Sequence, residues 1–220
     1  MFTGLIEEIG IVKSVKSSGE SGGGIYLTVS AAKVLNNIKT GDSISIDGAC
    51  QTVTGFTDDS FTVFASKVTM EATTFGSLSS GRRVNLERAM SADARFGGHF
   101  VQGHIDGRGK IKSIAKDGSG LSIEIAVSKG ISKYIVAKGS IAVDGISLTV
   151  VALSDSGFRL YIIPETIKNT TLIEKKTGAE VNIEIDILSK YVEKMAGTAA
   201  DDHEQQNKKL RRILMEEGFM

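Results

Sequence analysis

The sequence predicts an all-β chain made of two copies of one small barrel. The first observation is an internal repeat: Ser43–Val53 matches Ser140–Val150 at a shift of 97 residues, and the match continues without a gap to Glu87. The second is the alternation of apolar and polar residues in short segments, which is the period of half-buried strands. About six strands per hundred residues is the density of a small barrel or sandwich, and closure into a barrel removes exposed edges.

The predicted strands follow in the same order in both copies. They are Gly24–Val29, Ser43–Asp47, Ser60–Phe64, Arg83–Glu87, Leu121–Val127, Ser140–Val143, Phe158–Ile163 and Glu180–Asp186. Turn-forming clusters separate them at Gly19–Gly24, Thr57–Ser60, Ser79–Gly81, Asp117–Gly120 and Ser154–Gly157. Two helical segments interrupt each copy, and these are Ser30–Ile38, Val68–Leu78, Ser128–Ala137 and Glu165–Glu174.

The end of the chain departs from the repeat. Leu188–Met195 is predicted to be a helix, and Asp201–Met220 follows it. A solvated or partly disordered tail and a packing helix in an oligomer are both open interpretations of this last stretch. We therefore expect two barrel domains, 1–98 and 99–187, and a C-terminal segment, 188–220.

Composition narrows the function classes. The 26 lysines and arginines balance 26 aspartates and glutamates, so neither nucleic acid nor a membrane surface is an expected partner. The start of the chain lacks the features of a signal peptide, and no apolar run approaches the ~18–20 residues of a membrane span. The single cysteine cannot form an internal disulfide and suits a reducing compartment. We expect a cytoplasmic protein.

One pair of matched positions carries small hydrogen-bonding side chains. Cys50 of the first copy corresponds to Ser147 of the second, and both come shortly after an Asp-Gly pair. Buried packing and contact with a ligand are equally good interpretations of these residues. Because similar domains usually form similar pockets, the repeat favours two ligand sites.

Two histidines bracket the junction between the copies. His99 and His104 are five residues apart on an extended segment, so their rings should face opposite sides and share neither a site nor a metal. Histidine exchanges protons near neutral pH. His104 replaces Leu5 of the first copy, and we favour it for proton chemistry. His99 can instead have a structural role, with its ring bonded to neighbouring backbone near the junction.

Other polar residues come without a motif. Glu165 and Thr166 either open a helix or bind a planar, carbonyl-rich ligand, as would Thr69 in the first copy. Lys138 is either a solvated charge or a binder of anions and hydroxyls, and Asp186 suits an N-cap. No phosphate-binding glycine loop, zinc-ligand spacing or nucleophile elbow occurs. The residues alone predict two small barrels that bind similar planar ligands, with no cofactor and no metal.

Five motifs resemble the riboflavin synthases of the alpha-chain type. They are Met1–Glu7, Asp47–Thr54, Gly98–Asp106, Asp144–Val150 and Ile163–Thr166, and the resemblance extends to about residue 195. It implies two six-stranded antiparallel Greek-key barrels, a C-terminal trimerisation helix and a homotrimer. It also implies a cofactor-independent transferase that dismutates two molecules of 6,7-dimethyl-8-ribityllumazine into riboflavin and 5-amino-6-ribitylaminouracil, the last step of riboflavin biosynthesis.

The resemblance further implies site residues. The catalytic positions would be Ser43, Cys50, His104, Lys138, Ser147, Thr149 and Asp186. The two lumazine pockets would be lined by Phe2, Thr3, Gly4, Leu5, Ile6, Cys50, Gln51, Thr52, Phe64, Ala65, Ser66, Lys67, Val68, Thr69, Gly103, His104, Ile105, Lys138, Ser147, Leu148, Thr149, Ile162, Ile163, Pro164, Glu165, Thr166 and Ile167. Each barrel would hold one lumazine, and the first barrel of one subunit would face the second barrel of a neighbour.

The expected partners are therefore lumazine, riboflavin and further copies of this chain, with lumazine synthase as a further candidate. Gln51 departs from the leucine that many members carry, so the two pockets should differ in polarity. A lumazine-binding antenna or carrier protein without turnover is the alternative function. Such proteins tend to lose polar residues in one half, whereas this chain keeps them in both, which favours the enzyme.

Overall fold

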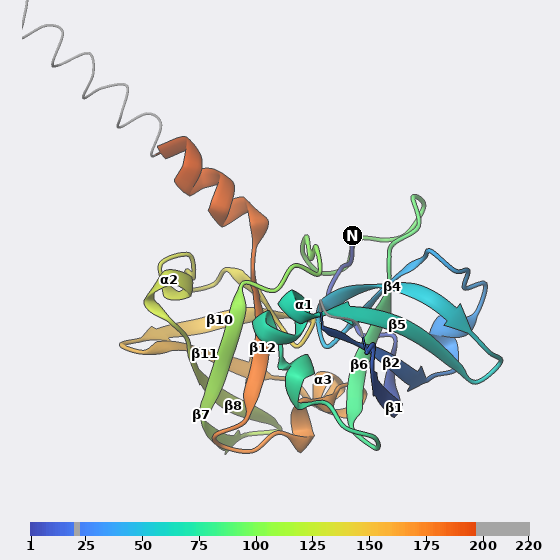
Figure 1. The fold of residues 1–220 in the computed structure, drawn as a ribbon. Helices are drawn as coiled ribbons and strands as arrows, with labels where there is room; N and C mark the ends of the chain where they lie inside the picture. Colours follow the sequence, from blue (N-terminus) through green and yellow to red (C-terminus); the bar gives the residue numbers. More distant parts are fainter. Residues whose placement is uncertain (20–22, 197–220) are drawn as a thin grey trace, which may run out of the picture. The chain divides into compact units, whose positions relative to one another are not determined.

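Two closed antiparallel barrels make up most of the molecule (Figure 1). The computed structural model describes residues 1–19 and 23–196, and the predicted tail lies outside them. The chain divides into two compact units: Met1–Asp186 contains both barrels, and Ile187–Met220 begins with a helix over 187–196. The predicted fold, two six-stranded antiparallel barrels in tandem, is confirmed.

The two barrels have the same topology. The first closes in the order β1-β2-β5-β4-β3-β6, with β1 (Glu8–Ser17), β2 (Gly24–Ser30), β3 (Ser43–Ile46), β4 (Ala49–Phe56), β5 (Ser60–Ser66) and β6 (Arg83–Arg88). The second closes in the equivalent order from β7 (Gly107–Asp117), β8 (Gly120–Ala126), β9 (Ser140–Val143), β10 (Ile146–Ser154), β11 (Gly157–Ile162) and β12 (Glu180–Ile185).

Four strands, β1, β4, β7 and β10, were not delimited by the alternation of apolar residues. Each of them contains a shift of register, which lies between Val12 and Ser14 in β1 and between Val53 and Gly55 in β4. The matching shifts in β7 and β10 fall at equivalent places. A bulge inserts one residue and reverses the faces that follow it, so the period of two breaks within the strand.

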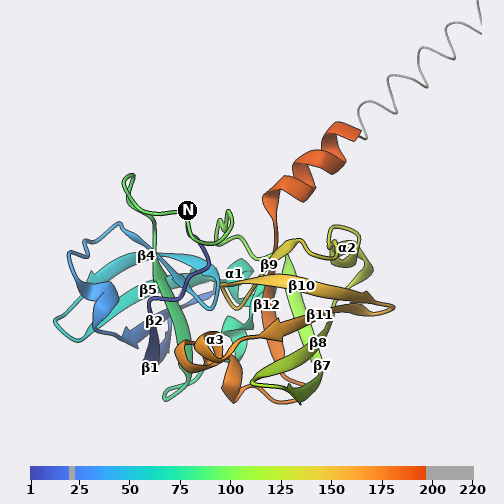
Figure 2. The same ribbon diagram turned by 180° about the vertical axis from the view of Figure 1, so that it is seen from behind.

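The predicted helices are shorter and divided. Short turns η1 (Lys33–Leu35) and α2 (Lys129–Ser132) replace the first predicted helix of each copy. The second becomes α1 (Lys67–Ala72) with η2 (Thr74–Ser77), and in the second copy α3 (Pro164–Asn169) with η3 (Thr171–Glu174). Thr73 and Thr170 are extended and cap the following turn, which interrupts each helix. In both views α1 and α3 lie between the barrels (Figures 1 and 2).

The barrels meet through two hairpin turns. Asp47 and Asp144 begin these turns with φ of 43° and 45°, and the glycines that follow them touch each other. Asn85 Nδ2 donates to the carbonyl of Asp144 at 3.0 Å, and Asn182 Nδ2 donates to the carbonyl of Asp47 at 2.8 Å. These reciprocal bonds give the junction an approximate two-fold symmetry, so corresponding residues of the repeat occupy equivalent places.

Candidate active site

The linker between the barrels covers the outer face of the first barrel. We call residues 101–105 the linker strap. The Cys50 N–H donates to the carbonyl of Gly103 at 2.9 Å. Gly103 has φ of 82°, and a Cβ there would lie 2.5 Å from the Cβ of Cys50, so this close approach requires glycine. The half-buried Cys50 thus lies against the strap residue that precedes the exposed His104, and we call this place the N-terminal site.

The start of the chain covers the second barrel in the same way. We call residues 2–6 the N-terminal strap. The Ser147 N–H donates to the carbonyl of Gly4 at 2.8 Å, and a Cβ on Gly4 would lie 2.6 Å from the Cβ of Ser147. A cavity of about 150 Å³ opens here, the C-terminal site, lined by Gly4, Leu5, Ile6, Ile146, Ser147, Glu165, Thr166, Asn169 and Thr170. Most of these are residues that the sequence predicted for a pocket.

A histidine that sequence reasoning did not favour contacts a lining residue of the C-terminal site. His99 Nδ1 lies 2.7 Å from Ser147 Oγ, and the side chain is only 7% exposed. Burial lowers the pKa of His99, against the opposing charge of Asp186, so the ring is neutral near pH 7 and can accept a proton. His99 thus contacts the second barrel, whereas His104 follows Gly103, which contacts the first. The sequence offered no sign of the contact, because His99 lies 48 residues from Ser147.

Comparisons with known proteins agree with this arrangement. The lumazine binding domain matches residues 3–89 and 102–186, one match for each barrel. A riboflavin synthase of Actinobacillus pleuropneumoniae is 44% identical over 219 residues and covers the full length of both chains. The chain belongs to the riboflavin synthase family. The riboflavin synthase of Bacillus subtilis is 41% identical over 219 residues, again at full coverage of both chains.

A solved structure shares the fold. LumP complexed with riboflavin has a TM-score of 0.77 at 23% sequence identity, covering 84% of this chain and 99% of that one. At this identity the likeness concerns the fold alone. It agrees with the six-stranded barrels described above.

Three other positions that the motif resemblance implied lie on or beside the strands that carry Cys50 and Ser147. Thr149 is exposed on β10 two residues beyond Ser147, on the same outer face. Lys138 is exposed, with φ of 66°, and its N–H donates to the carbonyl of Val150. A non-glycine residue in this conformation is strained, which is often seen at functional positions. Ser43 on β3 pairs with Thr52 on β4, two residues along the strand from Cys50. Ser43 therefore lies on the same outer face as Cys50.

Other implied lining residues point into the protein. They are Phe2, Gln51, Ala65, Leu148 and Ile162, all of them buried. Gln51 donates from Nε2 to its neighbouring carbonyl at 2.6 Å and lies on the inner face of β4. Because alternate residues of a strand face opposite sides, a continuous stretch of a strand cannot line an outer pocket with every residue.

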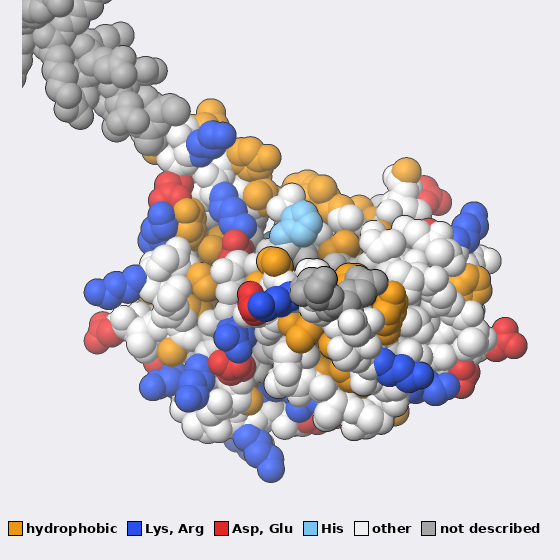
Figure 3. Space-filling view, in the orientation of Figure 1, with side chains coloured by type: hydrophobic (Ala, Val, Ile, Leu, Met, Phe, Trp, Pro, Cys, Tyr) orange, Lys and Arg blue, Asp and Glu red, His pale blue; other side chains and the backbone are white. Residues whose placement is uncertain are grey.

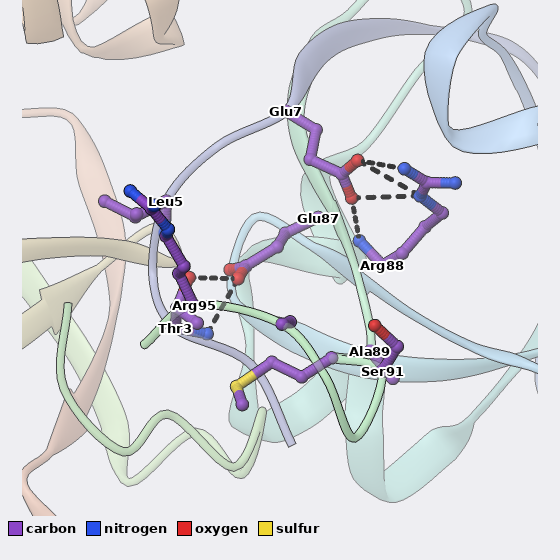
Figure 4. Close-up of a pocket in the computed structure, with 10 residues that line it drawn as sticks. Thr3, Leu5, Glu7, Glu87, Arg88, Ala89, Ser91 and Arg95 are labelled. Atoms are coloured by element: carbon purple, nitrogen blue, oxygen red, sulfur yellow. Dashed lines mark hydrogen bonds and ion pairs between the residues drawn. The ribbon is translucent and has the colours of Figure 1, made fainter. Parts of the chain in front are cut away.

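A further cavity lies beside the N-terminal strap (Figure 4). It measures about 370 Å³, and its lining is Thr3, Leu5, Glu7, Glu87, Arg88, Ala89, Met90, Ser91, Ala94 and Arg95. Glu87 points toward Thr3, and Glu7 forms an ion pair with Arg88 at 2.6 Å (Figure 4). Part of this lining belongs to the Met1–Glu7 motif and to Glu87 at the end of the repeat. The remaining lining residues lie between 88 and 95, outside every motif, so the sequence did not indicate that these two segments form one cavity.

Residues 1–19 and 23–196 show neither a metal-ligand cluster nor a helix that could span a membrane. In this part of the chain no three His, Cys, Asp or Glu side chains gather as metal ligands. The helices described there include none with the length and apolar character needed to cross a bilayer.

Proposed function

We propose that this chain catalyses the riboflavin synthase reaction, in which two molecules of 6,7-dimethyl-8-ribityllumazine yield riboflavin and 5-amino-6-ribitylaminouracil. One lumazine transfers a four-carbon unit to the other. The observation that carries the proposal is the relationship to riboflavin synthases, 41–44% identical over the full chain, together with two equivalent strapped sites. Each barrel binds one lumazine, between its strap and the outer face of β4 or β10.

The C-terminal site supplies proton chemistry. His99 is neutral because burial lowers its pKa, and it bonds Ser147 Oγ at 2.7 Å. The C7 methyl group of lumazine is acidic because the conjugated ring spreads the negative charge that remains when a proton leaves. We assign His99 as the group that accepts this proton, through Ser147, and such general-base catalysis contributes about 10²–10⁴ in rate.

The N-terminal site holds the second lumazine beside Cys50 and His104. Holding two rings in reacting register turns a bimolecular step into a nearly unimolecular one, which lowers the barrier by several kcal/mol. The proposed assembly is a homotrimer in which the N-terminal site of one subunit meets the C-terminal site of another. Exposed apolar side chains near the straps, including Leu5, Phe96 and Phe100, support such a contact.

Apolar side chains also gather around a histidine on the face shown in Figure 3. The proposed trimer depends on the helix over 187–196, which exposes Leu188, Tyr191 and Val192. Truncation after Asp186 should therefore reduce the mass of the assembly in light scattering. An unchanged mass would contradict this role of the helix.

The balanced charge and single cysteine support a cytoplasmic location.

A lumazine carrier without turnover is the second candidate, because the LumP structures share this fold. The presence of Cys50 and His104 in one site and of Ser147 with His99 in the other favours the enzyme. The test is to mix the full chain with 6,7-dimethyl-8-ribityllumazine, follow riboflavin by absorbance and measure stoichiometry by chromatography. One riboflavin per two lumazines at a catalytic rate supports the proposal. Tight binding without riboflavin formation identifies a carrier.

A further inference from the structure

The N-terminal strap is attached to the first barrel by the side chain of Glu87 on β6. Its Oε1 accepts hydrogen bonds from the backbone N–H and the hydroxyl of Thr3, both at 2.7 Å (Figure 4). Its Oε2 accepts one from the Gly4 N–H at 2.9 Å. The next contact of the same strap is on the other barrel, where Gly4 accepts the bond from Ser147. A side chain of the first barrel thus holds the backbone that covers the second.

The linker strap repeats this arrangement in the opposite direction. Glu184 on β12 accepts hydrogen bonds from the Gln102 N–H at 2.6 Å and from the Gly103 N–H at 2.9 Å. Gly103 then accepts the bond from Cys50 on the first barrel. A side chain of the second barrel therefore holds the backbone that covers the first.

The chemistry of both anchors requires a carboxylate. Glu87 and Glu184 are buried, and each uses both oxygens as acceptors for backbone N–H groups. Hydrogen bonds to an ionised acceptor are about twice as strong as neutral ones. Glutamine has nearly the same shape but presents one NH₂ group, which cannot accept from an N–H. Substitution by glutamine therefore removes at least one bond and leaves a buried donor facing another donor.

We infer that Glu87 and Glu184 are positioning residues that act across the barrel junction: Glu87 positions the strap of the C-terminal site, and Glu184 positions the strap of the N-terminal site. The inference rests on the proposed assignment of the two ligand sites. The site on each barrel is therefore completed by a glutamate of the other barrel.

The chain offers a direct probe of one strap. Cys50 is the only cysteine, and its Cβ packs against Gly103 of the linker strap. Because the strap covers part of this half-buried residue, the rate of Cys50 alkylation by iodoacetamide rises when the strap is held less firmly. Glu184→Gln should raise this rate about tenfold, the change expected when a buried charge-assisted hydrogen bond is lost. Glu87→Gln, the matched control on the other strap, should change it less than about twofold, because the Gly103–Cys50 contact is untouched.

The mirror experiment moves the thiol to the other site. In a Cys50→Ser, Ser147→Cys background, the single thiol lies under the N-terminal strap. There the expected pattern reverses: Glu87→Gln accelerates alkylation about tenfold, and Glu184→Gln has little effect. Circular dichroism establishes that each variant is folded. If a glutamine variant unfolds, Glu87→Asp and Glu184→Asp keep the charge but shorten the reach, and the same crossed pattern is expected.

The crossed pattern separates positioning from general stability. Equal acceleration by both substitutions in either background would mean general loosening and would overturn the inference. Unchanged alkylation in folded variants would overturn it as well. Thiol reactivity needs no lumazine, so the result is independent of riboflavin formation. A wild-type chain that forms no riboflavin refutes the proposed function, whereas loss of the crossed pattern refutes the roles of Glu87 and Glu184.

Discussion

Replacing Asp47 with asparagine should stabilise the folded protein at alkaline pH. Asp47 lies buried at the barrel junction, and its Oδ1 accepts from the Asn85 N–H at 2.7 Å. Burial first, and the charge of Asp144 second, raise the pKa of Asp47 from 3.8 to about 7, against opposing charges on Lys175 and Arg82. Asparagine keeps an oxygen for the bond but carries no charge, so it removes the titration.

The raised pKa of Asp47 makes the folded protein less stable as the pH rises. Between pH 3.8 and about 7 the folded protein holds a proton that the unfolded chain has lost, so stability falls as the pH rises through this window. At 1.36 kcal/mol per pKa unit, the rise of the Asp47 pKa from 3.8 to about 7 lowers the free energy of unfolding above pH 7 by about 4 kcal/mol relative to its value below pH 3.8. Glu180 also lines the small cavity beside Asp47.

The matched control is Asp144→Asn, at the equivalent turn of the second barrel. There Lys175 Nζ lies 2.5 Å from Asp144 Oδ2, and the two side chains are 3% and 0% exposed. Removing this carboxylate leaves a buried ammonium without its partner, which costs about 3–5 kcal/mol. Leu78 occupies the place of Lys175 in the first copy, so the two substitutions should have opposite signs at alkaline pH.

The assay is urea unfolding at pH 5 and pH 8, followed by circular dichroism. The gain in unfolding free energy from Asp47→Asn should be about 2–3 kcal/mol larger at pH 8 than at pH 5. Asp144→Asn should destabilise at both. An Asp47→Asn effect that is the same at the two pH values would refute the assignment of a raised pKa to Asp47.

Three other substitutions test the sites. His99→Gln should reduce the rate of riboflavin formation by about 10²–10⁴ in absorbance assays, more than His104→Gln does, and an equal loss would contradict the assignment of the base. Gly103→Ala should lower the thermal unfolding midpoint more than Gly81→Ala does. The Cβ added at Gly103 would lie 2.5 Å from the Cβ of Cys50, whereas a Cβ at Gly81 meets nothing within 4 Å. Equal shifts of the midpoint would mean that only the positive φ of the two glycines matters. Lys138→Gly should relieve about 1 kcal/mol of backbone strain while lowering turnover, and unchanged turnover would remove the Lys138 side chain from the reaction.

Much of the fold could be predicted because its signals are local or repeated. The repeat at Ser43–Val53 and Ser140–Val150 established two copies, and alternation delimited eight of the strands. The other four remained hidden because a bulge breaks the period of two within each of them. The motifs that resemble the riboflavin synthases indicated the family, which the comparisons confirm.

The sequence by itself determined the fold class, the number of barrels and the pairing of Cys50 with Ser147, since each depends on periodicity or on matched positions. Only the tertiary structure decided that His99 bonds Ser147 and that Glu87 and Glu184 hold the straps. These contacts join residues 48 to 84 positions apart. Such pairs come together only when the barrels close and dock, and local periodicity carries no information about which distant backbone a buried carboxylate or imidazole will meet.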